Sequence, residues 1–157
     1  MGDKVPPDTA QERKIEIRAA TVVDAQEIAR LLTLLGHPTT ESAIRKNWQE
    51  WAAAGNTAFV VPREDGTLAG VVTLHQMRVL HRPRVVGRIT SLVVDLPQRG
   101  CGIGRALVEA AEEALARAGC GLLEITSNLR RADAHAFYER LGYARTSIRL
   151  AKSLVPA

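Results

Sequence analysis

Aromatic residues are scarce in this sequence of 157 residues, at 4%, and the only cysteines are Cys101 and Cys120. The two cysteines form neither a CxxC pair nor a metal-ligand spacing, so we expect no metal site and no redox motif. No run of about 18 apolar residues occurs, which argues against a membrane-spanning helix. The opening stretch, MGDKVPPDTAQERK, lacks the apolar core of a secretion signal. These absences predict a cytoplasmic protein with no membrane partner.

The overall composition is that of an ordinary globular protein, with 46% hydrophobic and 24% charged residues. A chain of this length buries a sizeable core as one domain. We expect a flexible N-terminal tail over residues 1–13, which are polar and include a Pro-Pro pair, and a single domain over residues 14–157.

The net charge of +4 is modest, but the basic residues gather in one region. Between residues 78 and 105 Asp95 is the only acid, and the arginines are Arg78, Arg82, Arg84, Arg88, Arg99 and Arg105. Such a stretch suits a phosphorylated small ligand or a nucleic acid. Few aromatic side chains are present to stack on bases, so we expect no nucleic-acid partner.

The hydrophobic spacing predicts alternating helices and strands. Strands are expected over residues 14–20, 57–61, 68–80, 84–95 and 121–127, with final strands over 144–154. Helices are expected over residues 24–35, 44–52, 104–118 and 134–141. The Asp65-Gly66 pair predicts a hairpin, and the strand, helix and strand from residue 84 to 127 predict a parallel pair. We interpret Trp48 and Trp51 as packing residues, with a ligand platform as the alternative.

The segment QRGCGIGRAL, residues 98–107, places three glycines at every second position between two arginines, just before a helix. Glycine lets backbone N–H groups converge on one point, and a helix N-terminus adds partial positive charge. The segment therefore predicts an anion site. It matches neither the Walker loop nor the dinucleotide fingerprint, because its glycine spacing differs from both.

The spacing Arg99-x-x-Gly102-x-Gly104 resembles the signature of the GNAT superfamily of acetyl-CoA-dependent N-acyltransferases. The stretch LVVDLPQRGCGIGRALVEAAEEALARAGC is similar to the family's cofactor motif, and SNLRRADAHAFYERLGY is similar to its downstream motif. The resemblance implies an α/β (α+β) fold. It consists of a mixed, mostly antiparallel sheet of six to seven strands, flanked by about four helices, with a cofactor cleft where strands four and five splay.

The resemblance also implies where acetyl-CoA binds. The diphosphate is expected on the backbone of residues 99–105, and the pantetheine along a bulge in the fourth strand near residues 92–94, where Val93 or Val94 would donate to the oxyanion. Later contacts are expected from the end of strand five and the following helix. The full set of expected cofactor residues is Leu92, Val93, Val94, Arg99, Gly100, Cys101, Gly102, Ile103, Gly104, Arg105, Asn128, Arg131 and Ala134.

Tyr138 matches the family's general acid, which would protonate the leaving thiolate of coenzyme A. The general base is open, because Thr90 and Ser91 stand where many relatives carry a carboxylate. The candidates are Glu124, His75, His81, His135 and a chain of water molecules.

From these resemblances we expect an N-acetyltransferase that moves the acetyl group of acetyl-CoA directly to a small primary amine in a ternary complex. The amine is expected to enter between the early helices and the loop over residues 75–88. The alternatives are a protein N-terminal or lysine acetyltransferase and a non-catalytic acyl-CoA sensor. A homodimer is possible.

Overall fold

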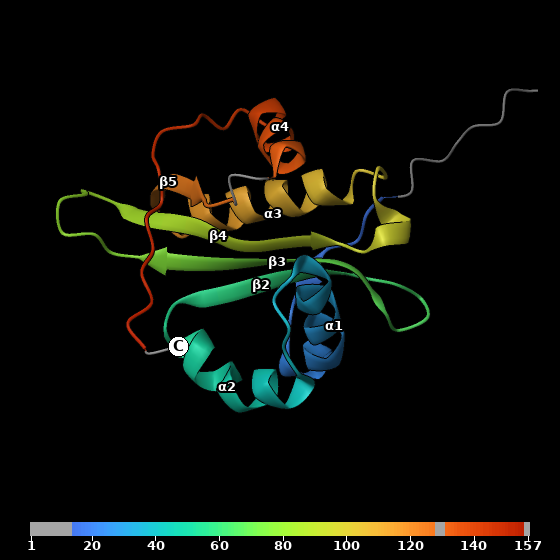
Figure 1. The fold of residues 1–157 in the computed structure, drawn as a ribbon. Coiled ribbons are helices and arrows are strands. Elements are labelled where there is room, and N and C mark those ends of the chain that lie inside the picture. The colour runs from blue at the N-terminus through green and yellow to red at the C-terminus, as the bar shows by residue number, and fades with distance from the viewer. Residues whose placement is uncertain (1–13, 128–130, 156–157) are drawn as a thin grey trace, which may run out of the picture.

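A computed structural model of the protein describes residues 14–127 and 131–155 and shows one mixed sheet with helices on both faces (Figure 1). Helices α3 and α4 lie on one side of the sheet, and α1 and α2 lie on the other. In chain order the elements are β1 (Arg18–Ala19), the 3-10 helix η1 (Val22–Asp24), α1 (Ala25–Leu35), α2 (Glu41–Ala53), β2 (Asn56–Pro62), β3 (Leu68–Met77), β4 (Val85–Val94), the 3-10 helix η2 (Leu96–Gln98), α3 (Ile103–Arg117), β5 (Cys120–Ile125) and α4 (Ala132–Arg140).

The sheet has the strand order β1-β2-β3-β4-β5. Neighbouring strands from β1 to β4 are antiparallel, whereas β4 and β5 are parallel and are joined through α3. The predicted parallel pair is therefore confirmed. The predicted hairpin is also present between β2 and β3, where Gly66 has a φ of 83° and Asp65 accepts a hydrogen bond from the Thr67 amide (2.9 Å).

Two hydrophobic layers cover the two faces of the sheet. Beneath α3 the buried residues include Leu107, Val108 and Leu115, which pack on Val72 and Ile89 of the sheet. The second layer joins α1 and α2 to the opposite face through Ile28, Leu31, Val60, Val71 and Val93. Alternation along each strand supplies both layers, because successive side chains point to opposite faces.

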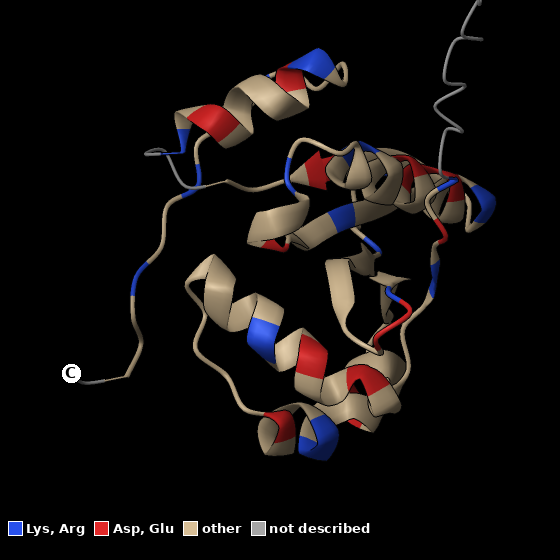
Figure 2. Ribbon diagram, turned by 90° about the vertical axis from the view of Figure 1, so that its right-hand side faces the viewer, with Lys and Arg blue, Asp and Glu red and all other residues tan. Residues whose placement is uncertain are grey.

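The first two helices follow the expected hydrophobic spacing. Helix α1 ends at Gly36, whose φ of 101° is favourable for glycine. Helix α2 begins at Glu41, three residues before the predicted start, because the Thr40 side chain caps it by accepting a hydrogen bond from the Ala43 amide (3.2 Å). Acidic and basic residues are both spread over the helices (Figure 2).

The prediction of six to seven strands is wrong, because the sheet has five strands over residues 14–127 and 131–155. Residues 144–155 form no strand, and the apolar side chains of Ile148, Leu150 and Leu154 are exposed there. A strand exists only where its backbone pairs with a neighbour, and alternation alone does not provide one. The first strand is also shorter than predicted, since only Arg18 and Ala19 pair with β2.

In the part of the chain that the structure describes, no helix is both long and apolar enough to cross a membrane. Over the same residues, no three His, Cys, Asp or Glu side chains gather in a way that would hold a metal ion.

Candidate active site

Strands β4 and β5 separate halfway along β4. Their pairing runs from Val85 to Ile89, which lies opposite Ile125, whereas β4 itself continues to Val94. Within the part of the chain that the structure describes, residues 90–94 therefore have no partner strand on the β5 side. Unpaired backbone groups at such a point are free to bond a ligand that lies along the strand, which is the role expected for Leu92, Val93 and Val94.

A bulge lies at the point of separation. The register of β3 against β4 changes from Thr73↔Ser91 to Leu74↔Ile89, so Thr90 has no opposite residue. The bulge precedes the predicted position at residues 92–94, because the extra residue lies where β4 leaves β5. Its effect is to change the alternation of β4 and to turn Thr90 and Ser91 toward the same pocket.

The glycine-rich loop joins the end of β4 to α3. Gly100 and Gly102 have φ values of 80° and 81°, a backbone conformation that favours glycine. Gly102 is the N-cap of α3, and its carbonyl accepts the first helical hydrogen bond, from Ala106 (3.0 Å). Within the described residues, the amides of Ile103, Gly104 and Arg105 have no acceptor, as at any helix start. Amides in this position suit an anion, which is the role expected for the loop.

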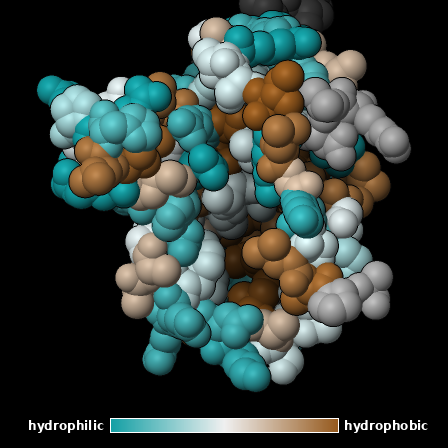
Figure 3. Space-filling model, turned by 60° about the vertical axis from the view of Figure 1, so that its left-hand side comes forward, coloured by the Kyte–Doolittle hydropathy of each residue, from teal (hydrophilic) through white to brown (hydrophobic). Residues whose placement is uncertain are grey.

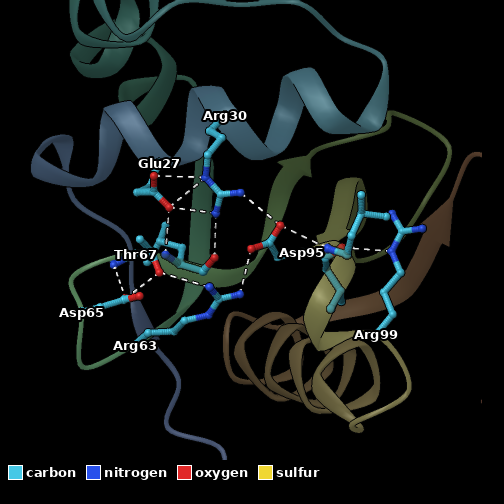
Figure 4. Close-up of polar contacts among 10 residues, drawn as sticks. Glu27, Arg30, Arg63, Asp65, Thr67, Asp95 and Arg99 are labelled. Atoms are coloured by element: carbon cyan, nitrogen blue, oxygen red, sulfur yellow. Dashed lines mark hydrogen bonds and ion pairs between the residues drawn. The ribbon is translucent and has the colours of Figure 1, made fainter.

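The side chains of the loop differ in their surroundings. Ile103 is buried in the layer beneath α3, so only its backbone faces the loop. Cys101 and Arg105 are exposed. Arg99 is exposed too, but its Nε donates to the Val94 carbonyl (3.2 Å), which holds the arginine against the end of β4 (Figure 4).

Asp95, the next residue after β4, is the centre of a charge cluster that the sequence analysis did not identify (Figure 4). Its carboxylate accepts hydrogen bonds from Arg30 of α1 (3.0 Å) and from Arg63 after β2 (2.8 Å). The Arg30 guanidinium holds the pKa of Asp95 below its ordinary value, and Arg63 adds to the effect. Arg30 also bonds Glu27, whose pKa it lowers. This Asp95 cluster ties the start of the glycine-rich loop to the opposite face of the sheet.

Tyr138 lies on α4, half-buried between the rings of Phe137 (5.1 Å between centroids) and Tyr143 (5.8 Å). Burial raises the pKa of Tyr138 to about 12, and nearby Arg131 partly offsets the rise. A Cβ added at Gly104 would lie 3.4 Å from the Phe137 ring, so α4 packs on the start of α3. The phenol is therefore a neutral O–H group on the helix beside the loop.

The other residues expected on this side have less defined positions. Arg131 precedes α4, is exposed, and forms an ion pair with Asp133 (3.6 Å). Ala134 is half-buried in the first turn of α4. Asn128 lies outside the described residues. The Tyr143 hydroxyl donates to Glu112 of α3 (2.7 Å), so it links the segment after α4 to α3.

A pocket of about 280 Å³, hereafter the acceptor-side pocket, lies on the other face of the sheet against α1 and α2. Trp48 and Trp51 of α2 line it, with ring centroids 5.2 Å apart. The two tryptophans also pack on the second hydrophobic layer, so they are packing residues and pocket walls at once. The face in Figure 3 is hollowed near its centre, with hydrophobic side chains along the hollow.

Three hydroxyl side chains of the sheet also line the acceptor-side pocket: Thr73 of β3, and Thr90 and Ser91 at the bulge of β4. The Thr73 and Thr90 hydroxyl oxygens lie 2.7 Å apart. The pocket therefore adjoins the point where β4 leaves β5. Thr73 and Thr90 were not linked in the sequence analysis, since 17 residues separate them.

None of the four candidate bases lines the acceptor-side pocket. Glu124 accepts a hydrogen bond from Arg88 across the parallel pair (2.8 Å). His75 is half-buried near the end of β3, His135 is half-buried on α4, and His81 is exposed after β3. The geometry thus brings Tyr138 and the loop to one face and the hydroxyl groups to the other, while the base stays open.

Comparison with known proteins places this geometry in context. Residues 23–143 match the acetyltransferase (GNAT) family. Aminoalkylphosphonate N-acetyltransferase of Salmonella typhimurium is 34% identical over 140 residues, which cover 88% of this chain and 91% of that protein. Glucosamine 6-phosphate N-acetyltransferase 1 of Oryza sativa subsp. japonica is 29% identical over 117 residues, covering 72% and 69%. The solved structure of a Trypanosoma brucei acetyltransferase superposes with a TM-score of 0.79 at 26% identity, covering 88% of this chain and 99% of that one.

Proposed function

Because the chain belongs to the acetyltransferase (GNAT) family, we propose that it transfers the acetyl group of acetyl-CoA directly to the primary amine of a small molecule, in a ternary complex. The observation that carries the proposal is the bulge at Thr90. It marks the point where β4 leaves β5, and it also borders the acceptor-side pocket. One short stretch of β4 thus faces a cofactor cleft and an acceptor pocket.

The residues on the cofactor side fit a ligand with a diphosphate and an extended amide chain. The free amides of Ile103, Gly104 and Arg105 suit the diphosphate, and the exposed arginine at 105 adds positive charge. The unpaired edge of residues 90–94 suits the pantetheine amides, which bond as an extra strand would. Acetyl-CoA supplies an activated acetyl thioester there.

Acetyl transfer needs a donor to the carbonyl oxygen, on which negative charge develops, and a donor to the sulfur. The backbone N–H group of Val93 or Val94, at the separated end of β4, serves the oxygen. The Tyr138 phenol serves the sulfur as a general acid. Because its pKa is raised to about 12, it stays protonated, and hence able to donate, throughout the physiological range.

The acceptor-side pocket favours a small molecule over a protein. Its volume of about 280 Å³ lies near the lower end of small-ligand pockets, and it is bounded by α1, α2 and the sheet. Several relatives support this assignment, since the names of the Salmonella and rice proteins specify small amines. The amine must lose a proton before attack, and the group that takes the proton stays open among Glu124, His75, His81, His135 and a chain of water molecules.

The decisive experiment is a steady-state assay of free thiol release from acetyl-CoA with a panel of primary amines. We expect thiol release that depends on the amine, with an acetylated product of matching amount. If acetyl-CoA and amine are varied together, double-reciprocal plots should intersect, as a ternary complex requires. Parallel plots would indicate an acetylated enzyme instead, and Cys101→Ser, which removes the exposed thiol of the loop, is the matched control. Binding of acetyl-CoA without thiol release from any amine or peptide would favour the sensor.

A further inference from the structure

We propose that the paired hydroxyl groups of Thr73 and Thr90 bind the amino group of the acceptor, and that the acceptor-side pocket selects an amine whose only charge is on that nitrogen. The inference deepens the proposed function, because it names the acceptor class of the same site. The hydrogen bonds of the two threonines and the uncharged lining of the acceptor-side pocket support it.

A count of hydrogen atoms shows what the hydroxyl pair offers a ligand. The Thr90 hydroxyl donates to the Thr73 carbonyl (3.1 Å), and the two hydroxyl oxygens lie 2.7 Å apart. Each hydroxyl has one hydrogen. Both contacts form together only if Thr90 donates to the carbonyl and Thr73 donates to Thr90. The pair then presents lone pairs and no free hydrogen, so it accepts hydrogen bonds and donates none.

An amino group is the partner that such a pair needs. A primary amine carries two N–H donors and its protonated form carries three, whereas a carboxylate or phosphonate offers only acceptors. Ser91 stands next to the pair, and its hydroxyl offers acceptor lone pairs as well as one hydrogen. The pair therefore distinguishes an amine from an anion by hydrogen-bond direction.

The bulge places this pair at the reaction point. Thr90 has no opposite residue on β3, and the pairing of β4 with β5 ends one residue before it. An amine held by Thr90 thus lies at the end of the stretch that we assign to the acetyl group and pantetheine. A regular strand would point Thr90 and Ser91 to opposite faces. The bulge instead directs both into the pocket.

The rest of the pocket selects for an uncharged body. Among the described residues that line it, none is Asp, Glu, Lys or Arg. The walls are mainly the indole rings of Trp48 and Trp51 and aliphatic side chains of α1 and α2, including Ile28, Leu32 and Ile44. The uncharged polar side chains of Thr39 and Asn47 also line the pocket. A phosphonate or phosphate would be desolvated there without a cationic partner, which is costly. The pocket thus favours an arylalkyl or alkyl amine over the phosphonate and phosphate compounds in the relatives' names.

The test uses intrinsic fluorescence, because Trp48 and Trp51 are the only tryptophans of the chain and both line the pocket. The probe is 2-phenylethylamine, titrated into the full-length protein without acetyl-CoA. We expect a saturable change in tryptophan fluorescence. Phenylacetate, a carboxylate of similar size that lacks the amino group, should bind at least about tenfold more weakly, which corresponds to one lost charge-assisted hydrogen bond. 2-Aminoethylphosphonate keeps the amino group but should also bind at least about tenfold more weakly, because its phosphonate would be desolvated without a cationic partner.

Three variants test whether the hydroxyl pair binds the amine. Thr90→Val keeps the branched shape of the side chain and removes the hydroxyl, so it should weaken 2-phenylethylamine binding about tenfold or more. Thr90→Ser keeps the hydroxyl and should stay within about threefold of the wild type. Thr73→Val removes the other hydroxyl of the pair, the one that bonds Thr90, and should weaken binding in the same way. Far-ultraviolet circular dichroism and thermal unfolding confirm that each variant is folded before its titration is compared.

The outcomes separate this inference from the proposed function. Equal or tighter binding of phenylacetate or 2-aminoethylphosphonate would overturn the inference, as would wild-type affinity in both valine variants or no saturable change with 2-phenylethylamine. If 2-phenylethylamine binds as expected but no thiol is released with acetyl-CoA, the inference stands and the proposed function fails. If thiol release requires a phosphorylated amine, the proposed function stands and the inference fails.

Discussion

The Tyr138 phenol illustrates how the surroundings of one residue determine its chemistry. It lies between two aromatic rings, and burial raises its pKa to about 12. Removing water from a phenol disfavours the phenolate, so the neutral O–H form dominates. Such a group donates a proton or hydrogen bond and does not act as a base, which agrees with its assignment beside the leaving sulfur.

Replacing Tyr138 with phenylalanine should lower kcat by about 10²-fold, the usual contribution of a general acid. The KM for acetyl-CoA should change by less than about threefold, because the diphosphate contacts in the loop remain. Steady-state thiol release measures both values. Tyr143→Phe is the matched control, since that hydroxyl bonds Glu112, and it should keep kcat near the wild-type value. Equal losses in both variants would contradict the assignment.

The pH dependence of kcat provides a second test of the Tyr138 pKa. The phenol must be protonated, and a folded pKa of about 12 means that it stays so as pH rises to about 10. An alkyl amine, with a pKa near about 10.4, becomes reactive over the same range. We expect kcat to rise or level off between about pH 6 and 10 without an alkaline decline. A decline that vanishes in Tyr138→Phe would show a lower pKa in the working enzyme.

At the scale of elements, the start of α3 and the end of β4 form one unit. Positive φ values at Gly100 and Gly102 turn the chain so that the first amides of α3 have no protein acceptor in the described residues. The Asp95 cluster holds the preceding residue to α1 and to the segment after β2. The residue before the loop is therefore fixed by ion pairs, and the first amides of α3 are available for the anion that we propose binds there.

Two glycines at opposite ends of α3 allow a matched test of the loop. Gly102 and Gly119 both have a φ of 81°, so alanine at either position should cost about 1 kcal/mol of stability through the same backbone strain. Only Gly102→Ala lies in the anion site, so only this variant should weaken coenzyme A binding, by about tenfold or more. Isothermal titration calorimetry measures binding, and denaturant unfolding measures stability. Equal coenzyme A affinities in both variants would contradict the site.

Asp95→Asn tests the Asp95 cluster. Removing the negative charge leaves Arg30 and Arg63 without their shared partner and should lower the free energy of unfolding by about 2 kcal/mol near pH 7. The folded pKa of Asp95 lies below its ordinary value of 3.8, so its stabilising effect is present above that value and disappears as pH falls through the folded pKa. Urea unfolding of both proteins should therefore show a difference that narrows below about pH 4. A constant difference across this range would rule out the charge as the cause.

At the scale of the whole molecule, the two faces of the sheet have separate tasks. The face under α3 and α4 carries the loop and Tyr138, and the face under α1 and α2 carries the acceptor-side pocket. Strand β4 belongs to both, because its bulge lies between them. A ligand of the size of acetyl-CoA would contact β4, α3 and α4 together. The homodimer stays a prediction that light scattering checks.

Acetyl-CoA should stabilise the whole domain against heat. At a concentration about 100 times its Kd, a ligand that binds only the folded protein adds about 2.7 kcal/mol. For a chain of this size, that raises the Tm by about 5–10 °C. Differential scanning fluorimetry with acetyl-CoA and, separately, inorganic phosphate at the same concentration checks this. Equal shifts would mean that the loop binds phosphate without recognising the rest of the cofactor.

The sequence by itself determined the features that depend on local spacing. Hydrophobic periodicity predicted the four helices, the Asp65-Gly66 pair predicted the β2–β3 hairpin, and the order strand, helix, strand predicted the parallel pair. The glycine spacing predicted the loop before α3. The sequence also predicted strands over residues 144–154, where the structure has none. Alternation shows that a segment is able to pair, but it supplies no neighbouring strand.

Only the tertiary structure decided the register of β4, the Asp95 cluster and the acceptor-side pocket. The bulge at Thr90 follows from how β4 fits between β3 and β5, and no local pattern marks it. Thr73 meets Thr90, and Asp95 meets Arg30 and Arg63, only after the sheet has formed. Spacing along a chain describes which face a residue occupies within its own element. Contacts between elements depend on register and packing, which are properties of the folded molecule.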